Sequence, residues 1–256
     1  FRLKPVAGGD ISEAFKVRFD DGSVAFLKGH DDPPANLFRG EAEGLRALAD
    51  AGAPVPAVLG VHPQAILLEW LELGPGPAGA EAGEMLARLH RMPVAGFGGQ
   101  PDNYLGTLVQ SQPVCGSWLE LYRDRRLRPL AKGTPRPLRR AIDQLLPRLE
   151  SLLDLPDPAS PVHGDLWAGN LGATDRGAVL FDPAFYTGHR EVDLAMALLF
   201  GGFDTSFFAA YENVYPRTKE WRSRVALHQI YPVLAHYHLF GAPYDRNALR
   251  LIEPYL

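Results

Sequence analysis

The segment His163-Gly-Asp-Leu-Trp-Ala-Gly-Asn170 places an acid, Asp165, five residues before an amide, Asn170, on a loop that contains two glycines. A carboxylate can orient a hydroxyl group and accept its proton, whereas an amide oxygen can bind Mg²⁺. The short apolar run at 178–181 then ends at Asp182, a second possible metal ligand. Singly, these acids could cap a turn or end a strand. Together they predict a phosphoryl-transfer site, because the Asp-to-Asn spacing equals that of the kinase catalytic loop.

A lysine and a glutamate nearer the N-terminus extend this pattern. Lys28 ends the predicted strand Ser23–Lys28, and Glu41 lies on the apolar stripe of the helix that follows. The stripe consists of Phe38, Leu45 and Leu48. A carboxylate on an inward face needs a cation, and Lys28 is the obvious partner, whereas Glu43 points away from the stripe. Kinases use such a pair to hold the α- and β-phosphates of ATP, so we predict that Lys28 and Glu41 meet.

A third segment, Ala7-Gly8-Gly9-Asp10-Ile11-Ser12, precedes the first clear strand. Glycines allow the backbone to approach a phosphate closely, and the Ser12 hydroxyl could donate a hydrogen bond. A Gly-Gly pair before a strand is more often a simple turn. By itself this segment would not indicate a nucleotide site. Because the kinase-like residues described above are also present, we expect Gly8, Gly9 and Ser12 to contact ATP.

The predicted elements form two parts that could bring these residues together. Strands at 13–19 and 23–28 are joined by Asp20-Asp21-Gly22, a good hairpin turn, and a helix then runs to about Ala51. Apolar runs at 58–61 and 65–69 complete a sheet. Beyond the Gly- and Pro-rich segment 73–79 helical patterns dominate. We expect an α+β, bilobal fold with a small antiparallel-sheet lobe (1–70), a hinge (71–79) and a larger helical lobe (80–256).

Two polar residues in the helical part are predicted to be structural. Asp193 opens a very apolar helix, and we expect its carboxylate to be buried against the backbone of the catalytic loop. His90 lies four residues after Leu86 on an apolar helix face, which is typical of a hydrogen-bonded core histidine.

The composition narrows the class of protein. With 256 residues, 46% of them hydrophobic, the chain can bury a sizeable core. Its formal net charge of −4 gives no field that would attract nucleic acid or an anionic membrane, and it has no apolar run of about 18 residues. The single cysteine, Cys115, excludes a disulfide within the chain and favours a reducing compartment. We expect a cytoplasmic enzyme with no nucleic-acid or membrane partner.

Over essentially its whole length the chain resembles the fructosamine kinases, or ketosamine-3-kinases, which are related to aminoglycoside and choline phosphotransferases. The motifs that carry the resemblance are Gly-Gly-x-Ile-Ser at 8–12, Phe-Arg-Gly-Glu-Ala-Glu-Gly-Leu at 38–45, Arg-Asp-Arg-Arg-Leu-Arg-Pro at 123–129, the loop at 163–170, the segment at 182–196, and Phe200-Gly-Gly-Phe203. Trp167 and Gly188-His189-Arg190-Glu191 distinguish the family from its aminoglycoside relatives.

The resemblance implies a protein-kinase-like fold and phosphorylation, with ATP and Mg²⁺, of the sugar O3 of a free or protein-bound ketosamine. It implies that the adenine contacts the backbone at the hinge, from Glu69 to Leu71. Trp167, His189 and Arg190 become candidate substrate residues. An indole such as that of Trp167 suits the C–H face of a sugar and attracts an ammonium group. We expect a monomer.

Two alternatives remain open. One is an aminoglycoside or other amino-alcohol phosphotransferase, which would use the same catalytic residues on a different acceptor. The other, from a different class, is a pseudokinase that binds a nucleotide without transferring phosphate. The pseudokinase is disfavoured because the chain has every residue that the chemistry requires: Lys28, Glu41, Asp165, Asn170 and Asp182.

Overall fold

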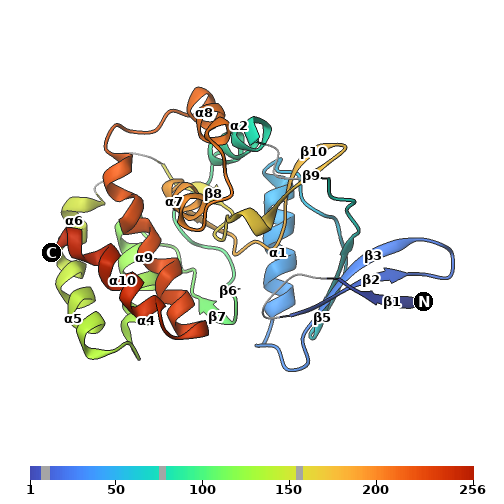
Figure 1. The fold of residues 1–256 in the computed structure, drawn as a ribbon, viewed down its shortest axis with the longest axis horizontal. Coiled ribbons are helices and arrows are strands. Elements are labelled where there is room, and N and C mark those ends of the chain that lie inside the picture. The colour runs from blue at the N-terminus through green and yellow to red at the C-terminus, as the bar shows by residue number, and fades with distance from the viewer. Residues whose placement is uncertain (7–11, 75–78, 154–157) are drawn as a thin grey trace.

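The computed structural model describes residues 1–6, 12–74, 79–153 and 158–256 (Figure 1). It confirms the predicted α+β class: an N-terminal sheet with one helix is followed by a mostly helical C-terminal part. In Figure 1 the sheet and the N-terminus lie at the right, and the helices near the C-terminus lie at the left. The lobe boundaries at 70 and 80 stay a prediction.

The N-terminal sheet is antiparallel and has five strands in the order β1-β2-β3-β5-β4. The strands span Arg2–Pro5 (β1), Glu13–Arg18 (β2), Val24–Gly29 (β3), Val58–His62 (β4) and Ala65–Glu69 (β5). The predicted hairpin joins β2 to β3, and Gly22 makes its turn with a φ of 87°. Lys28 therefore lies near the end of the middle strand of the sheet.

Helix α1 (Leu37–Asp50) packs on this sheet and has the predicted apolar stripe. Phe38 and Leu45 are buried in one cluster with Ile66 and Leu68 of β5. Leu48 belongs to a different cluster, which is built mainly from the C-terminal part. Because one stripe of α1 contacts both parts of the fold, the helix is well placed to hold them in register.

The C-terminal part is built mainly from helices and short hairpins. Its helices are α2 (Gly79–His90), α3 (Trp118–Glu120), α4 (Arg128–Ala131), α5 (Arg136–Leu145), α6 (Leu149–Leu152), α7 (Glu191–Leu199), α8 (Thr205–Val214), α9 (Trp221–Phe240) and α10 (Tyr244–Ile252). A π-helical segment, Leu121–Leu127, joins α3 to α4. None of the described helices is long and apolar enough to cross a membrane.

Three two-stranded sheets support the loops of the C-terminal part. They pair β6 (Asn103–Leu105) with β7 (Leu108–Gln110), β8 (Ser160–Val162) with β11 (Tyr186–Gly188), and β9 (Leu171–Thr174) with β10 (Gly177–Leu180). The segment 163–170 lies between β8 and β9, and Asp182 follows β10 closely.

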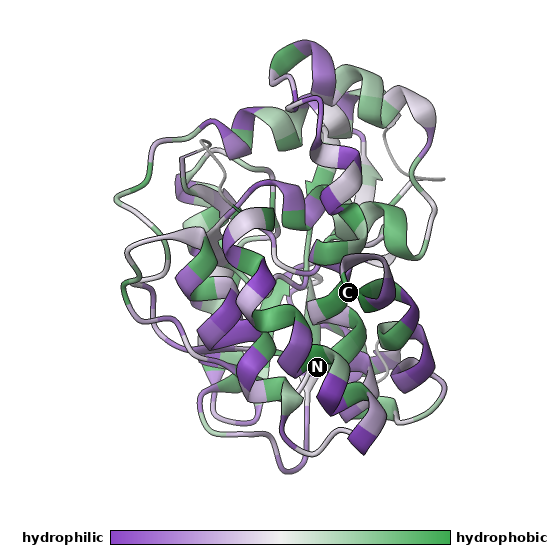
Figure 2. Cartoon of the chain, turned by 90° about the vertical axis from the view of Figure 1, so that its left-hand side faces the viewer, coloured by the Kyte–Doolittle hydropathy of each residue, from purple (hydrophilic) through white to green (hydrophobic). Residues whose placement is uncertain are grey.

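The helices of the C-terminal part enclose its main core. Buried side chains of α5, α9 and α10 form one hydrophobic cluster with the segment that includes α3. Figure 2 shows the corresponding pattern, with hydrophobic and hydrophilic stretches side by side along the same helices. The packed core of the helical part therefore supports the loop at 163–170.

Candidate active site

A cavity of about 400 Å³ lies where β3, α1, the loop at 163–170 and helices α7 and α9 meet. It brings together seven of the residues that the sequence singled out: Ser12, Lys28, Glu41, Asp165, Trp167, Asn170 and Asp182. These residues come from both parts of the fold and are separated by up to 170 positions in the chain. The remainder of the lining is mostly apolar.

Lys28 lies between two carboxylates. Its Nζ is 3.1 Å from Oε2 of Glu41 and 3.1 Å from Oδ1 of Asp182. Burial alone would lower the pKa of Lys28, but the charges of Glu41 and Asp182 outweigh it and raise that pKa above its ordinary value. Burial raises the pKa of Glu41, and the charge of Lys28 opposes this increase. The lysine is therefore a fixed positive charge at the cavity wall.

Helix α1 approaches the Asp182 segment closely because two of its residues lack a side chain. A Cβ atom at Gly44 would lie 3.0 Å from the Cβ of Phe185, and one at Gly40 would lie 3.1 Å from the Cβ of Asn103. Both distances are tighter than ordinary van der Waals contact. The two glycines are four residues apart and so lie on one face of the helix. They allow Glu41 to reach the same lysine as Asp182.

Gly164 is required by the shape of the catalytic loop, which is the segment 163–170. Its φ is 82°, in the left-handed region that glycine tolerates, and a Cβ atom there would collide with the carbonyl oxygen of Ala184. Asp182 also has a positive φ, 54°, which is uncommon outside glycine and is typical of strained functional segments. The backbone that carries Asp165 and Asp182 is therefore held in place by its surroundings.

Asn170 connects Asp165 of the catalytic loop to Asp182, which follows β10. Its Nδ2 donates to the backbone oxygen of Asp165 at 3.0 Å, to Oδ2 of Asp165 at 3.2 Å and to the backbone oxygen of Asp182 at 3.4 Å. These acceptors fix the orientation of the amide. The Asn170 amide oxygen and the Asp182 carboxylate are hard oxygen donors of the kind that Mg²⁺ binds.

The buried carboxylate of Asp193 binds the backbone at the start of the catalytic loop, as predicted. Its carboxylate accepts the backbone N–H groups of His163 at 2.7 Å and Gly164 at 2.9 Å. Burial alone would raise the pKa of Asp193, but its hydrogen bond with His90 and its contacts with the loop lower that pKa. His90 is buried between Asp193 and the hydroxyl of Tyr211, so it is a structural histidine.

Asp165 lies in an environment that holds its pKa near neutrality. Burial raises that pKa to about 7, and the neighbouring charge of Asp182 adds to the effect, while the hydrogen bond from Asn170 opposes it. A general base is most effective when its pKa lies close to the working pH. The environment of Asp165 therefore suits proton transfer from a hydroxyl group.

Trp167 lines the cavity two residues after Asp165, and its side chain is exposed. Its indole lies across Gly169, where a Cβ atom would collide with the ring. The glycine thus permits the ring to fold over its own loop. This position leaves an aromatic surface beside Asp165.

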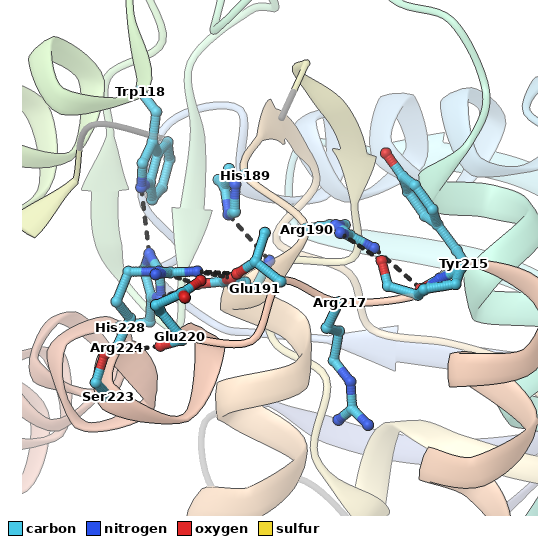
Figure 3. Close-up of polar contacts among 12 residues, drawn as sticks. Trp118, His189, Arg190, Glu191, Tyr215, Arg217, Glu220, Ser223, Arg224 and His228 are labelled. Carbon is cyan, nitrogen blue, oxygen red and sulfur yellow. Dashed lines mark hydrogen bonds and ion pairs between the residues drawn. The ribbon is translucent and has the colours of Figure 1, made fainter. Parts of the chain in front are cut away.

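His189 and Arg190 do not line the cavity; Figure 3 shows them in a separate buried network. The His189 ring stacks on that of His228 with 5.8 Å between their centroids. Arg190 donates to the backbone oxygens of Tyr215 and Pro216 at 3.1 and 2.9 Å. Both residues are almost fully buried. These contacts anchor the segment before α7, and a direct contact of His189 or Arg190 with the acceptor stays a prediction.

Glu191 completes this network through a bidentate ion pair with Arg224, at 2.9 and 2.6 Å. His189, Glu191 and His228 together have metal-ligand chemistry. However, Arg224 already occupies both Glu191 oxygens, and the indole N–H of Trp118 donates to Nε2 of His228 at 3.2 Å. The contacts are those of a structural network (Figure 3).

Gly8 and Gly9, the glycines predicted to contact the phosphates of ATP, lie outside the described residues. The adenine is predicted to contact the backbone from Glu69 to Leu71. Glu69 ends β5, where its N–H donates to the Ala57 oxygen and its carboxylate pairs with Arg176 at 2.8 Å. Glu69 and Leu71 lie outside the residues that line the cavity, so their role stays a prediction.

One side of the cavity has no counterpart among the residues predicted from the sequence. Asn103, Tyr104 and Leu105 of β6 line it, as do several apolar residues at the ends of α7 and α9. Asn103 is buried and donates to the Phe185 oxygen at 2.7 Å. The run Asn103-Tyr-Leu105 is too short to predict a strand by its pattern, and the cavity contact depends on tertiary packing.

Known proteins resemble this chain along its length. A family model for fructosamine kinase matches residues 2–256. A Thermus thermophilus protein named a probable ketoamine kinase is 40% identical over 94% of this chain and 88% of its own length. The chloroplastic protein-ribulosamine 3-kinase of Oryza sativa subsp. indica is 32% identical over 99% of this chain and 78% of its own.

Solved structures agree with the sequence comparison. A crystal structure described as a fructosamine-3-kinase candidate, from Thermobifida fusca, has a TM-score of 0.90 and 34% identity, and the match covers 100% of this chain and 93% of that one. A choline/ethanolamine kinase family protein from Mesorhizobium loti shares the fold at a TM-score of 0.67 and 18% identity, covering 100% of this chain and 88% of its own.

Proposed function

The chain belongs to the fructosamine kinase family, and we propose that it transfers the γ-phosphoryl group of ATP to the O3 hydroxyl of a ketosamine. A ketosamine is the product of sugar attachment to an amine, so the reaction would mark glycated amines for repair. Membership makes the protein a phosphotransferase that uses ATP and an alcohol acceptor. The particular sugar, amine and hydroxyl belong to the proposal.

One observation carries the proposal: Lys28, paired with Glu41 and Asp182, shares a single cavity with Asp165 and Asn170. Phosphoryl transfer needs mainly positioning and charge stabilisation. The ammonium of Lys28 would hold the phosphates, and Asp165 would orient the acceptor hydroxyl and accept its proton. A pseudokinase role is disfavoured because the residues for nucleotide binding and for proton transfer occur together.

Asp182 and Asn170 would hold the Mg²⁺ ion, which when bound neutralises charge on the transferred phosphoryl group. The fit rests on the donor set, a carboxylate and an oriented amide beside Lys28. Asp182 and Asn170 would also fix the ion relative to Asp165, since Asn170 is hydrogen-bonded to that acid.

Removing the metal is expected to abolish turnover. Activity should vanish in excess chelator and return with Mg²⁺ or Mn²⁺. Asp182→Asn should raise the metal concentration required for half-maximal activity, because a neutral ligand replaces a charged one. Asp175→Asn, an exposed acid in the turn between β9 and β10, is the matched control. Full activity of the wild type in excess chelator would rule out the metal-dependent mechanism.

A panel of acceptors tests the substrate class. We expect ribulosamines or fructosamines to be phosphorylated with a higher kcat/KM than aminoglycosides, choline or free sugars, measured by ADP release. The exposed indole of Trp167 beside Asp165 supports this ranking, because it offers a flat apolar face to the sugar and a π surface to the protonated amine. Efficient phosphorylation of kanamycin or choline with no ketosamine turnover would instead favour the amino-alcohol alternative.

Several finer features are part of the proposal. The adenine would hydrogen-bond to backbone between Glu69 and Leu71, at the start of the hinge 71–79, and Gly8, Gly9 and Ser12 would cover the phosphates. His189 and Arg190 would contribute to acceptor binding through the segment that they anchor. The proposal also includes a monomer and a cytoplasmic location; the single cysteine, Cys115, which excludes a disulfide within the chain, supports the location.

A further inference from the structure

Three exposed aromatic side chains surround the mouth of the cavity. Trp167, Phe200 and Phe240 have 41, 46 and 47% of their surface exposed, and all three line the cavity. Among the described residues, the only other Phe or Trp that is exposed to this degree is Phe1, at the N-terminus. A cluster of large exposed apolar side chains marks a binding surface, whereas exposed apolar residues that are scattered singly need no such explanation.

We define the aromatic rim as Trp167, Phe200 and Phe240, and His236 packs against its two phenylalanines. The His236 ring contacts Phe200 with 5.0 Å between centroids, and Phe240 with 5.6 Å. Nδ1 of His236 is 2.8 Å from the Pro232 carbonyl oxygen within α9, so Nδ1 carries the proton and the ring is fixed. A rim whose members are already packed loses little conformational entropy when a ligand binds.

Charge on the cavity wall disfavours a negatively charged ligand at the rim. Among the described residues that line the cavity, Lys28 is the only Lys or Arg, and two carboxylates already neutralise it. Met196, Leu239 and Ala235 fill the wall beside Phe200 and Phe240. A carboxylate placed there would meet apolar surface and the negative field of Asp165 and Asp182.

We propose that the aromatic rim binds the substituent on the ketosamine nitrogen and selects uncharged, apolar substituents over those that carry a carboxylate. This inference rests on the proposed function. In a ketosamine the nitrogen is bonded to C1. The hydroxyl that must reach Asp165 is on C3, two carbons further along the sugar chain. A substituent on that nitrogen therefore leaves the site close to Trp167, where the rim begins. The protonated nitrogen itself is attracted to aromatic faces.

Three ribulosamines that differ only on nitrogen test the inference: N-methyl, N-benzyl and N-carboxymethyl. With the full chain, Mg²⁺ and ATP, we expect kcat/KM for N-benzyl to exceed that for N-methyl by about tenfold, the low end of what a hydrophobic pocket discriminates. The N-carboxymethyl compound should be the poorest of the three. ADP release and the phosphorylated product are both measured.

Variants of the rim residues then test whether the preference for the N-benzyl compound depends on the aromatic rim. In the double variant Phe200→Ser/Phe240→Ser, the benzyl-to-methyl ratio of kcat/KM should fall to about one. This ratio does not depend on the fraction of protein that is folded. Leu198→Ser is the matched control, because Leu198 is an exposed residue of α7, 42% accessible, that does not line the cavity. It should keep the wild-type ratio.

The outcomes separate the two levels of the proposal. Equal kcat/KM for the three ribulosamines, or a benzyl preference that survives in the double variant, would overturn the role of the rim while the proposed function stands. If kanamycin or choline is phosphorylated while no ribulosamine or fructosamine is, the proposed function fails and the rim inference fails with it.

Discussion

Replacing Asp165 with asparagine is expected to lower kcat by about 10²–10⁴-fold, the usual effect of losing a general base. Asparagine keeps the shape of the side chain but cannot accept a proton at neutral pH. Binding of ATP should stay near that of the wild type, because the phosphates are held by Lys28. The measurements are steady-state kcat with a ketosamine acceptor and equilibrium binding of ATP.

Stability provides the internal control for this variant. Burial raises the pKa of Asp165 to about 7 and so disfavours its charged form, and a neutral asparagine should not destabilise the fold. The urea midpoint of Asp165→Asn should therefore equal or exceed that of the wild type at neutral pH. A kcat within a few-fold of the wild type would remove Asp165 from the role of base.

Replacing Lys28 with alanine should reduce kcat/KM for ATP by about 10²-fold or more. Truncating one partner of a buried charge pair commonly costs about 2–5 kcal/mol in binding, and here the change leaves Glu41 and Asp182 without their shared cation. Glu41→Gln should produce a defect of the same kind but smaller, since Lys28 keeps Asp182. Steady-state kinetics with varied ATP measure both effects.

Glu43→Gln is the matched control on the same helix. Glu43 pairs with Arg39 at 2.9 Å on the surface of α1, four residues away. Exposed pairs of this type contribute about 0.3–0.5 kcal/mol, so kcat/KM should change by less than about threefold. Equal defects in Glu41→Gln and Glu43→Gln would show that the ion pair with Lys28 is not the cause.

The Lys28–Glu41 pair could be predicted from the sequence because local patterns determine both positions. A hairpin turn sets the end of the strand that carries Lys28, and the apolar stripe of α1 fixes the direction of Glu41. The burial of Asp193 under the catalytic loop followed for a similar reason, since an acid at the start of an apolar helix must find donors.

Other features depend on packing between distant segments and have no local signal. The glycines of α1 at 40 and 44 belong to the motif at 38–45, but no local pattern indicated that they allow the helix to approach Asn103 and Phe185. The rim residues Phe200 and Phe240 lie at the ends of two helices that are far apart in the chain. Helix α10 and the pair β8–β11 were not predicted either, because their short runs have no distinctive period.

The contact of His189 and Arg190 with the acceptor stays a prediction, and the motif that contains them also has a structural explanation. The Gly188-His-Arg-Glu191 segment distinguishes the family, which suggested contact with the acceptor. In the structure Arg190 donates to the backbone oxygens of Tyr215 and Pro216, and the buried ring of His189 stacks on His228 of α9. A distinctive motif can equally be set by packing, because a buried polar side chain requires specific partners.

The central claim is that phosphate moves from ATP to the O3 hydroxyl of a ketosamine in this cavity. ³¹P NMR of a reaction with a ribulosamine, ATP and Mg²⁺ tests it most directly. We predict one new phosphomonoester signal that couples to the proton on C3 of the sugar, appears in step with ADP and is absent with Asp165→Asn. Release of inorganic phosphate with no sugar phosphoester from any ketosamine, or an ester at a different oxygen, would contradict the account.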